Sequence, residues 1–291
     1  GAGVSGEDCG LAMGLLRDQR KAFFGSLCEE LISVTNGVVS FADSSSPASR
    51  AISFALAAKV GQPKNVAKKM NGQRAGALFE TACRAFISES FACLNHLRPG
   101  KFDVLPGAPI SRFDQYAHLN DIETLASASK ELRTAIGSDY LIKPDITIIR
   151  HPTDDATINT QSEFVDEHVA IYSPLRSVNR SLPSLHASIS CKWTIRSDRA
   201  QNSRSEALNL IRNRKGRLPH IAVVTAEPTP NRLASLALGT GDIDCVYHFA
   251  LPELREALVE QHREESLELL DMMIDGKRLR DISDLPLDLV V

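Results

Sequence analysis

The 291-residue chain carries a formal net charge of −3, and 43% of its residues are apolar. A chain of this size and composition can bury one large core, so we expect a single domain over residues 1–291, with residues 1–10 flexible. No apolar run reaches the roughly 18 residues of a membrane-spanning helix, and no signal peptide is recognisable. The six cysteines show neither CxxC nor Cys/His metal-ligand spacing. These features argue against a membrane protein and a disulfide framework, and they predict a reduced chain in the cytoplasm.

The first half of the chain is predicted to be mostly helical. Apolar residues at helical spacing indicate a helix over about residues 11–32, and a loop rich in Asn, Gly and Ser follows it. In this loop Asp43 lies among small residues, where its side chain could reach outward or cap the helix that starts near Ser49. Further helices are expected to about Val60, over 75–97 with Glu80 one turn in, and over 113–136.

The second half alternates strands with helices. Residues 145–150 indicate a strand headed by Pro-Asp, a dipeptide that is also common as simple turn chemistry. Residues 220–226 and 245–251 are short continuous apolar runs, as in strands that are covered on both faces. Residues 154–167 are polar and irregular, so we expect them to leave the core. The pattern predicts an α/β fold with a mixed central β-sheet and helices on both sides.

The stretch around Lys192 is the most informative part of the chain. From His186 to Ile195 apolar and polar residues alternate strictly, which predicts a half-buried strand with Lys192 on its polar face. The strand ends before Ser197 and Asp198, which are good N-caps for a helix over 199–212. The sequence therefore places Lys192 near the end of a strand and a helix shortly after it.

Charge is distributed unevenly along the chain. Between Lys192 and Arg217 there are eight lysines and arginines, against Asp198 and Glu206 as the acids, whereas the chain beyond Pro252 is mostly acidic. A basic stripe on an acidic body is typical of a protein that grips a polyanion in one cleft. A solvated helix face would produce the same charge run, so both interpretations stay open.

Three residues suggest a chemistry for this stretch. Asp145 on one strand, Lys192 on another and Glu206 on the adjoining helix could converge in a cleft. Two carboxylates with water ligands commonly hold Mg²⁺ and leave positions for phosphate oxygens. A lysine beside them can orient or deprotonate a water and offset negative charge in the transition state. This set of residues suits hydrolysis of a phosphodiester.

The same residues carry a resemblance to a known superfamily. Pro144-Asp145, Ser190-Cys191-Lys192 and Glu206 resemble the PD-(D/E)xK nuclease motif, with Ser190 in the usual acidic place and the glutamate fourteen residues after the lysine. A branch of type II restriction endonucleases shares this displacement. More closely, the chain resembles the NgoMIV family of these enzymes from about Val38 to its end. That resemblance is carried by His-Ala-Ser-Ile-Ser-Cys-Lys-Trp-Thr-Ile-Arg-Ser-Asp-Arg-Ala-Gln-Asn, Asn-Arg-Lys-Gly-Arg-Leu-Pro-His and Val-Thr-Ala-Glu-Pro-Thr-Pro.

The resemblance implies a restriction-endonuclease-like core and assigns roles to single residues. Catalysis falls to Asp145, Lys192 and Glu206, with Glu80 in a supporting acidic position. Two Mg²⁺ ions per active site are implied, with Asp145, Glu206 and the backbone carbonyl of Cys191 as protein ligands. DNA recognition is assigned to Arg196, Asp198 and Arg199 for the inner base pairs, to Asp43, Ser45 and Arg232 for the outer pair, and to Gln73 for the minor groove.

By the same resemblance, the substrate is double-stranded DNA at the palindrome GCCGGC, cut after the first G to leave CCGG overhangs. Arginine can donate two hydrogen bonds to guanine and aspartate can accept from cytosine, so Arg196, Asp198 and Arg199 suit two successive G·C pairs. A surface salt-bridge cluster is the other interpretation of these residues. A palindrome is read most simply by a two-fold dimer, and the resemblance adds a homotetramer in a bacterial cytoplasm.

Two other functions fit parts of the sequence. A sequence-specific DNA-binding protein of the same fold could have lost cleavage, although Asp145, Lys192 and Glu206 are all present. A nucleotide-sugar or phosphate enzyme of ordinary α/β type would need a glycine-rich phosphate loop after a strand, and the sequence has none. We therefore expect no nucleotide cofactor and no membrane partner.

Overall fold

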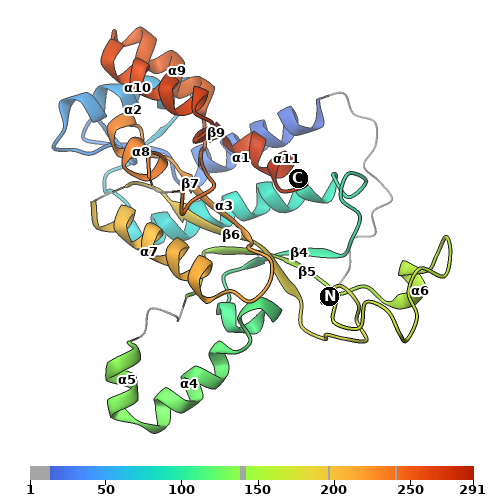
Figure 1. The fold of residues 1–291 in the computed structure, drawn as a ribbon. Coiled ribbons are helices and arrows are strands. Elements are labelled where there is room, and N and C mark those ends of the chain that lie inside the picture. The colour runs from blue at the N-terminus through green and yellow to red at the C-terminus, as the bar shows by residue number, and fades with distance from the viewer. Residues whose placement is uncertain (1–13, 138–141, 196, 240) are drawn as a thin grey trace. The chain divides into compact units, whose positions relative to one another are not determined.

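The computed structural model describes residues 14–137, 142–195, 197–239 and 241–291, which divide between two compact units (Figure 1). The first unit is made of Gly1–Arg98, Ser190–Arg204 and Ile221–Val291, and the second of Pro99–Ile189 and Ser205–His220. The tail that we expect to be flexible, residues 1–10, lies outside the described residues. One strand, β6 (Ser184–Lys192), and one helix, α7 (Ser197–Asn213), each begin in one unit and end in the other. The single domain over 1–291 stays a prediction.

The sheet of the first unit is parallel. Its strands β7 (His220–Thr225), β8 (Cys245–His248) and β9 (Leu279–Asp281) lie in that order, with Val224 opposite Tyr247 and Val246 opposite Leu279. The end of β6 adjoins β7, because the Lys192 carbonyl accepts a hydrogen bond from the Ala226 N–H at 3.3 Å. The interiors of β7 and β8 are buried, as the continuous apolar runs predicted.

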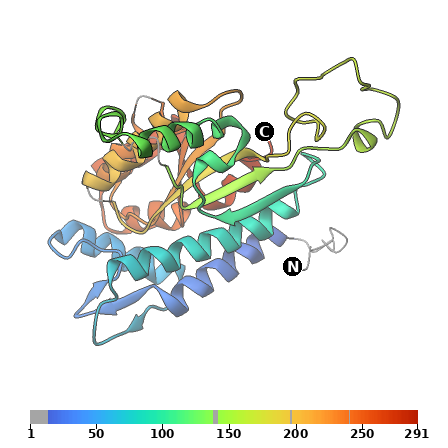
Figure 2. The same cartoon turned by 90° about the horizontal axis from the view of Figure 1, so that it is seen from below.

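Helices supply the rest of the first unit. Helices α1 (Leu15–Glu30) and α3 (Gly72–Ala92) run side by side, with the rings of Phe23 and Phe86 5.4 Å apart (Figure 2). Helix α2 (Pro47–Val60) packs on α9 (Leu251–Glu260), and helix α8 (Pro230–Ala237) packs on α10 (Glu264–Asp275). The remaining bounds are η3 Ile282–Asp284, α11 Leu285–Asp288, and a small sheet of β1 Ser33–Thr35, β2 Val38–Val39 and β3 Lys64–Asn65.

The second unit is built on antiparallel strands. Strands β4 (Phe102–Pro106) and β5 (Ile146–Arg150) pair, and β5 pairs with the first part of β6. Between β5 and β6 the chain forms an arm, residues 151–183, which extends away from the ends of these strands (Figure 2). The helices of this unit are η1 Ile110–Arg112, η2 Asp114–Tyr116, α4 Leu119–Ala128, α5 Lys130–Ile136, and α6 Asp155–Ile158 in the arm.

The overall class agrees with the sequence. The strand order β4-β5-β6-β7-β8-β9 mixes antiparallel and parallel pairs, and helices flank the strands. The fold is therefore mixed α/β, as predicted. Strand β4 was not foreseen, because its five residues include an aspartate and a proline and show no clear alternation.

The predicted continuous helix over 113–136 is wrong. Residues 110–116 form two short 3-10 turns, and α4 and α5 are separated at Ser129, whose backbone is extended. The Ser129 hydroxyl accepts a hydrogen bond from the Leu132 N–H at 3.1 Å, so it caps the second helix. Serine competes for backbone groups in this way, which favours a helix start over a helix interior.

The predicted strand over 186–195 is partly wrong. Strand β6 ends at Lys192, and the first part of its predicted polar face is covered, since His186 and Ser188 are each only 6% exposed, whereas Ser190 and Lys192 are half-buried. The ring of His186 packs against Phe102 of β4 at 5.1 Å. Alternation in the sequence therefore marks the two faces of the strand, but burial depends on what packs against each face.

Two expectations on composition can be compared with the structure. Among the cysteines that the structure describes, Cys28, Cys83, Cys93, Cys191 and Cys245 are not joined in disulfide bonds. The absence of a disulfide framework stays a prediction, because the sixth cysteine, Cys9, lies outside the described residues. In the described ranges, no helix is long and apolar enough to cross a membrane.

Candidate functional site

Lys192 lies at the last position of β6 and is half-buried. Its neighbour Cys191 is 7% exposed, which fixes the strand end in the core. The next residue, Trp193, packs edge-on against Phe41 at 5.6 Å and against Phe79 at 5.1 Å. Burial of this indole anchors the chain immediately after Lys192, so the lysine projects from a rigid position.

Glu80 belongs to the same neighbourhood. It follows Phe79 in α3 and is half-buried. Because Phe79 contacts Trp193, the segments that carry Glu80 and Lys192 are packed against each other. Gln73 lies at the start of α3, is exposed, and donates its N–H to the side chain of the N-cap Asn71 at 2.8 Å.

Asp145 directly precedes β5 in the second unit and is half-buried. The loop after β4 passes very close to it at Gly107. A Cβ atom on Gly107 would lie 1.8 Å from the Pro144 carbonyl oxygen and 3.2 Å from that of Asp145. Gly107 is therefore required for this approach, and a glycine after an apolar run was the only sign of its role in the sequence.

Glu206 lies on α7 within the second unit and is half-buried. One turn further along this helix, the Leu210 carbonyl accepts a hydrogen bond from the Tyr116 hydroxyl at 2.9 Å. Tyr116 is fully buried, and burial raises the pKa of its hydroxyl well above the usual value. The phenol thus acts as a neutral donor that fixes the part of α7 carrying Glu206.

The predicted catalytic residues are divided between the units. Asp145 and Glu206 belong to the second, whereas Lys192, Cys191 and Glu80 belong to the first. Among the residues that the structure describes, no three His, Cys, Asp or Glu side chains form a group suited to a metal ion. The convergence of these residues stays a prediction.

The predicted inner-pair residues follow Lys192 closely. Asp198 and Arg199 lie in the first turn of α7, so a helix start carries them as expected. Arg196 lies outside the described residues.

The predicted outer-pair residues come together in one cleft of the first unit. Arg232 of α8 forms an ion pair between its Nη2 and Oδ2 of Asp43, although 189 positions separate them in the sequence. The other oxygen of Asp43 accepts hydrogen bonds from the Ser45 N–H at 3.0 Å and the Ser45 hydroxyl at 2.6 Å. Three residues that were proposed for one base pair therefore form one hydrogen-bonded group.

This cleft has a volume of about 710 Å³. Apolar residues around Phe41 and Trp193 line part of it, and the aromatic cluster beside Lys192 therefore also borders the cleft. Polar and charged lining comes from Asp43, Ser44, Ser45, Lys69, Thr194 and Arg232. A cleft of this kind presents hydrogen-bond donors and acceptors above an apolar wall.

The charges in the cleft are well defined at neutral pH. Hydrogen bonds from Ser45, and then from Arg232, lower the pKa of Asp43 to about 2. Asp43 is therefore an ionised acceptor. The alternative that Asp43 caps the following helix is wrong, because Ser46 is the N-cap of α2 and accepts from the Ser49 N–H at 3.2 Å.

Glu227 is a residue of this region that the sequence analysis missed. It follows β7, is 0% exposed, and places its carboxylate 3.7 Å from Nη1 of Arg232. It also accepts hydrogen bonds from the Ile195 N–H at 3.0 Å and from the Thr229 hydroxyl at 2.5 Å. Burial raises the pKa of Glu227, although each of these partners favours its charged form. In the sequence, the one sign of its role was its position directly after an apolar run that predicts a buried strand.

Comparison with known proteins identifies the family of this chain. The family model described as NgoMIV restriction enzyme matches residues 23–291. The type II restriction enzyme NgoMIV of Neisseria gonorrhoeae is 51% identical over 284 residues, which cover 95% of this chain and 99% of that enzyme. This chain belongs to the NgoMIV restriction enzyme family. The predicted family and the prediction of a type II restriction enzyme are therefore confirmed.

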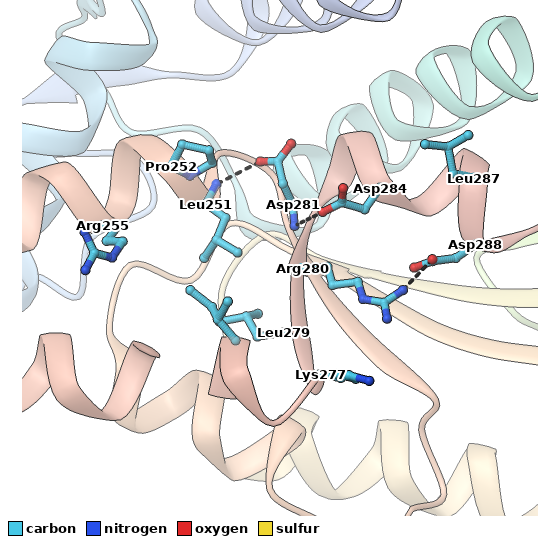
Figure 3. Close-up of a pocket in the computed structure, with 11 residues that line it drawn as sticks. Leu251, Pro252, Arg255, Lys277, Leu279, Arg280, Asp281, Asp284, Leu287 and Asp288 are labelled. Atoms are coloured by element: carbon cyan, nitrogen blue, oxygen red, sulfur yellow. Dashed lines mark hydrogen bonds and ion pairs between the residues drawn. The ribbon is translucent and has the colours of Figure 1, made fainter. Parts of the chain in front are cut away.

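A second cavity of about 560 Å³ in this NgoMIV-family chain was not foreseen (Figure 3). Its acidic residues already have internal partners. Asp281 accepts from the Leu251 N–H at 2.9 Å, Asp284 accepts from the Asp281 N–H at 3.0 Å, and Asp288 pairs with Arg280. These bonds tie β9 to the helices around it, so we assign this cavity a structural role.

Proposed function

We propose that this chain is a Mg²⁺-dependent endonuclease with a PD-(D/E)xK core that cuts double-stranded DNA at GCCGGC, after the first G, leaving CCGG overhangs. The observation that supports the site most directly is the group formed by Asp43, Ser45 and Arg232 in one cleft. These are the residues that the family resemblance assigns to the outer base pair. The cleft adjoins the segment that continues from Lys192 into α7.

The chemistry of the cleft suits a G·C pair. Arginine can donate two hydrogen bonds to O6 and N7 of guanine, and an ionised aspartate can accept one from N4 of cytosine. In this structure, Nη2 of Arg232 pairs with Oδ2 of Asp43. Binding of a G·C pair would replace this ion pair by contacts with the base edges. An A·T pair offers an adenine donor where Arg232 needs an acceptor, so it would bind less well.

The inner CCGG is assigned to the start of α7. Arg196 and Arg199 would contact guanines and Asp198 would accept from a cytosine. Two arginines at a helix start oppose the positive end of the helix dipole, a cost of roughly 0.3 to 1 kcal/mol each that phosphate or base acceptors can offset. Gln73 at the exposed start of α3 is proposed for the minor groove.

The proposed metal ligands fit Mg²⁺ by their donor chemistry. Asp145, Glu206 and the Cys191 carbonyl all offer oxygen, and Mg²⁺ is usually held by one or two carboxylates together with water. A third acidic side chain is therefore not needed. When bound, two Mg²⁺ ions would offset the charge on the phosphate and make water more acidic.

The chain's own side chains have separate tasks in this reaction. Lys192, held at the end of β6, would orient the attacking water through its ammonium and offset the negative charge that develops on the phosphate. Glu80 would support this lysine from the neighbouring helix α3, since Phe79 and Trp193 pack the two segments together. Asp145 depends on the close approach of Gly107 for its position.

Cleavage assays test this proposal. Plasmid DNA that contains GCCGGC should be cut with Mg²⁺ and remain intact without it. Lys192→Ala should lower the cleavage rate by several orders of magnitude and keep binding of the site, and Glu206→Ala should also weaken the metal dependence. Near-normal cutting by Lys192→Ala would contradict the assignment, and binding without cleavage by the unaltered chain would favour a DNA-binding protein instead.

Assembly is also proposed, as a dimer on each palindrome and a homotetramer of two dimers. The arm supports a further interface, because Phe164, Tyr172 and Val178 on it are 75%, 86% and 68% exposed. The arm has its own fixed structure, since the buried Arg176 pairs with Asp155 at 2.6 Å. An ordered surface that exposes large apolar groups is a common feature of a protein interface.

Sedimentation and two-site plasmids test the tetramer. The unaltered chain should sediment as a tetramer and cut a two-site plasmid faster than a one-site plasmid. Tyr172→Ser should shift it towards dimers, whereas Phe54→Ser, a similar loss at a 59% exposed residue on α2, should not. A dimer that cuts both plasmids at equal rates would show that the tetramer is wrong.

A further inference from the structure

We propose that Glu227 is a positioning residue that couples the two DNA-reading segments, because its buried carboxylate contacts both Arg232 and the backbone that leads into α7. This inference rests on the proposed function, in which Arg232 reads the outer pair and residues 196–199 read the inner pairs. It adds a residue that touches no base and yet affects the reading of both.

The contacts of Glu227 divide between its two oxygens. Oε2 accepts from the Ile195 N–H at 3.0 Å and lies 3.7 Å from Nη1 of Arg232. Oε1 accepts from the Thr229 N–H at 3.2 Å and from the Thr229 hydroxyl at 2.5 Å. The same oxygen therefore faces both reading segments, while the other one holds the loop before α8.

The burial of these groups makes the arrangement rigid. Glu227 is 0% exposed and Ile195 is 1% exposed, so water does not compete for their hydrogen bond. Ile195 directly precedes Arg196, and the Ile195 amide therefore sets where the inner-pair residues begin. A buried carboxylate without these hydrogen bonds would destabilise the fold. The hydrogen bonds therefore keep the backbone of Ile195 and the loop of Thr229 in place.

Arg232 can keep its contact with Glu227 while it reads a base. A guanidinium has five N–H donors, and the contact with Glu227 uses Nη1, whereas the contact with Asp43 uses Nη2. If DNA displaces Asp43, the side of the guanidinium next to Glu227 stays held. Glu227 thus fixes the plane in which Arg232 presents its donors, which bidentate recognition of guanine requires.

The coupling predicts that substitutions of Glu227 and of Arg232 weaken the recognition of different base pairs. Loss of Arg232 should affect the outer pair alone, because the Ile195 N–H would keep its hydrogen bond to Glu227. Loss of the Glu227 carboxylate should weaken the reading of the outer pair and of CCGG together. A residue that merely stabilised the core would lower the fraction of active protein, but it would leave the ratio of affinities for two DNA duplexes unchanged.

The experiment measures these ratios in Ca²⁺, so that binding is observed without cleavage. Duplexes with GCCGGC, with ACCGGT and with no CCGG are compared for the unaltered chain, Glu227→Gln, Glu227→Ala and Arg232→Ala. For Glu227→Gln we expect about a tenfold loss in the preference for GCCGGC over ACCGGT, about 1.4 kcal/mol. We also expect a loss in the preference for ACCGGT over DNA without CCGG, and this second loss should be absent in Arg232→Ala.

Controls separate this effect from unfolding. Asp271→Asn removes the carboxylate of another ion pair, with Arg255 at 2.8 Å, and should leave both ratios unchanged. Thr229→Val removes one partner of Glu227 and gives a milder test if Glu227→Ala does not fold. It should lower the same two ratios by a smaller factor.

The outcomes distinguish failure of the proposed function from failure of the coupling through Glu227. If the unaltered chain does not prefer GCCGGC, the proposed function fails and the coupling falls with it. If the unaltered chain shows the preference but Glu227→Gln keeps both ratios, the proposed function survives and the coupling is wrong. If Glu227→Gln changes only the outer-pair ratio, Glu227 positions Arg232 alone, and the proposed link to α7 is overturned.

Discussion

Two arginines of the first unit sit between pairs of carboxylates, but their surroundings differ. Arg20 forms four hydrogen bonds of 2.7 to 2.9 Å with Glu253 and Asp281 and lies over the ring of Phe24. Arg232 pairs with Asp43 through one nitrogen and approaches Glu227 at 3.7 Å through another. The Arg20 side chain is 18% exposed and the Arg232 side chain is 36% exposed.

The numbers of hydrogen bonds and the exposure indicate that the ion pairs of Arg20 are structural, whereas the ion pair of Arg232 with Asp43 can be broken by a ligand. Arg20 has its Nε and both terminal nitrogens engaged, and Asp281 also borders the structural cavity of Figure 3. Arg232 lies in an open cleft, and its contact with the buried Glu227 is long. Arg232 can therefore exchange Asp43 for a ligand and keep Glu227 on its other nitrogen, whereas the saturated Arg20 holds the fold.

The largest effect is expected when the saturated network is broken. Arg20→Ala should lower the free energy of unfolding by about 3 kcal/mol, since it leaves the carboxylates of Glu253 and Asp281 partly buried and uncompensated. Arg232→Ala should lower it by less, about 1 kcal/mol, because its pair with Asp43 is near the surface and the buried Glu227 keeps its hydrogen bonds from Ile195 and Thr229. Urea denaturation of both variants measures this contrast, and equal losses would remove the distinction between the two networks.

The second effect concerns DNA binding by the open network. Arg232→Ala should lose about 1 to 3 kcal/mol of the discrimination between GCCGGC and ACCGGT, the usual worth of one bidentate base contact. Arg20→Ala protein that remains folded should keep that discrimination. Competition binding in Ca²⁺ tests both variants. An equal loss of affinity for the two duplexes in Arg232→Ala would contradict its role at the outer pair.

The third effect is a pH dependence next to the Arg20 network. Burial lowers the pKa of His248 from 6.5 to about 4, against the opposing influence of Asp281. In this window the unfolded chain binds a proton that the folded chain does not bind. Stability should therefore fall as the pH decreases from 6.5 towards 4, by about 1.4 kcal/mol per pH unit. His248→Gln should reduce this slope in urea titrations, and an unchanged slope would exclude His248 as its source.

The smallest effect is expected for Asp43→Asn. The asparagine keeps an acceptor oxygen for cytosine, so discrimination at the outer pair should fall less than in Arg232→Ala. Stability should change by less than about 1 kcal/mol, as for other surface ion pairs. Because the pKa of Asp43 is lowered to about 2, its stabilising pair persists above its ordinary pKa of 3.8 and is lost only as the pH falls through about 2. Denaturation at pH 5 and pH 8 should give the same small difference.

The sequence by itself determined much of the local structure. Continuous apolar runs marked β7 and β8, and a helix ending near Val60 was expected, although α2 starts at Pro47 and not near Ser49. Asp145 at the head of β5 followed from the Pro-Asp dipeptide. These features depend on neighbours in the chain, whose spacing and backbone preferences are visible in any single sequence. The matching motifs also identified the family, which the comparison with known proteins confirmed.

The tertiary structure decided what meets across long distances in the chain. The sequence could not show that Asp43 pairs with Arg232 or that Gly107 must pass against Pro144. Glu227 illustrates the reason, because nothing in its neighbours reveals that its carboxylate accepts from the Ile195 amide. Local spacing determines the face on which a side chain lies. The segment packed on that face then determines whether the side chain is buried, charged or able to exchange its partner.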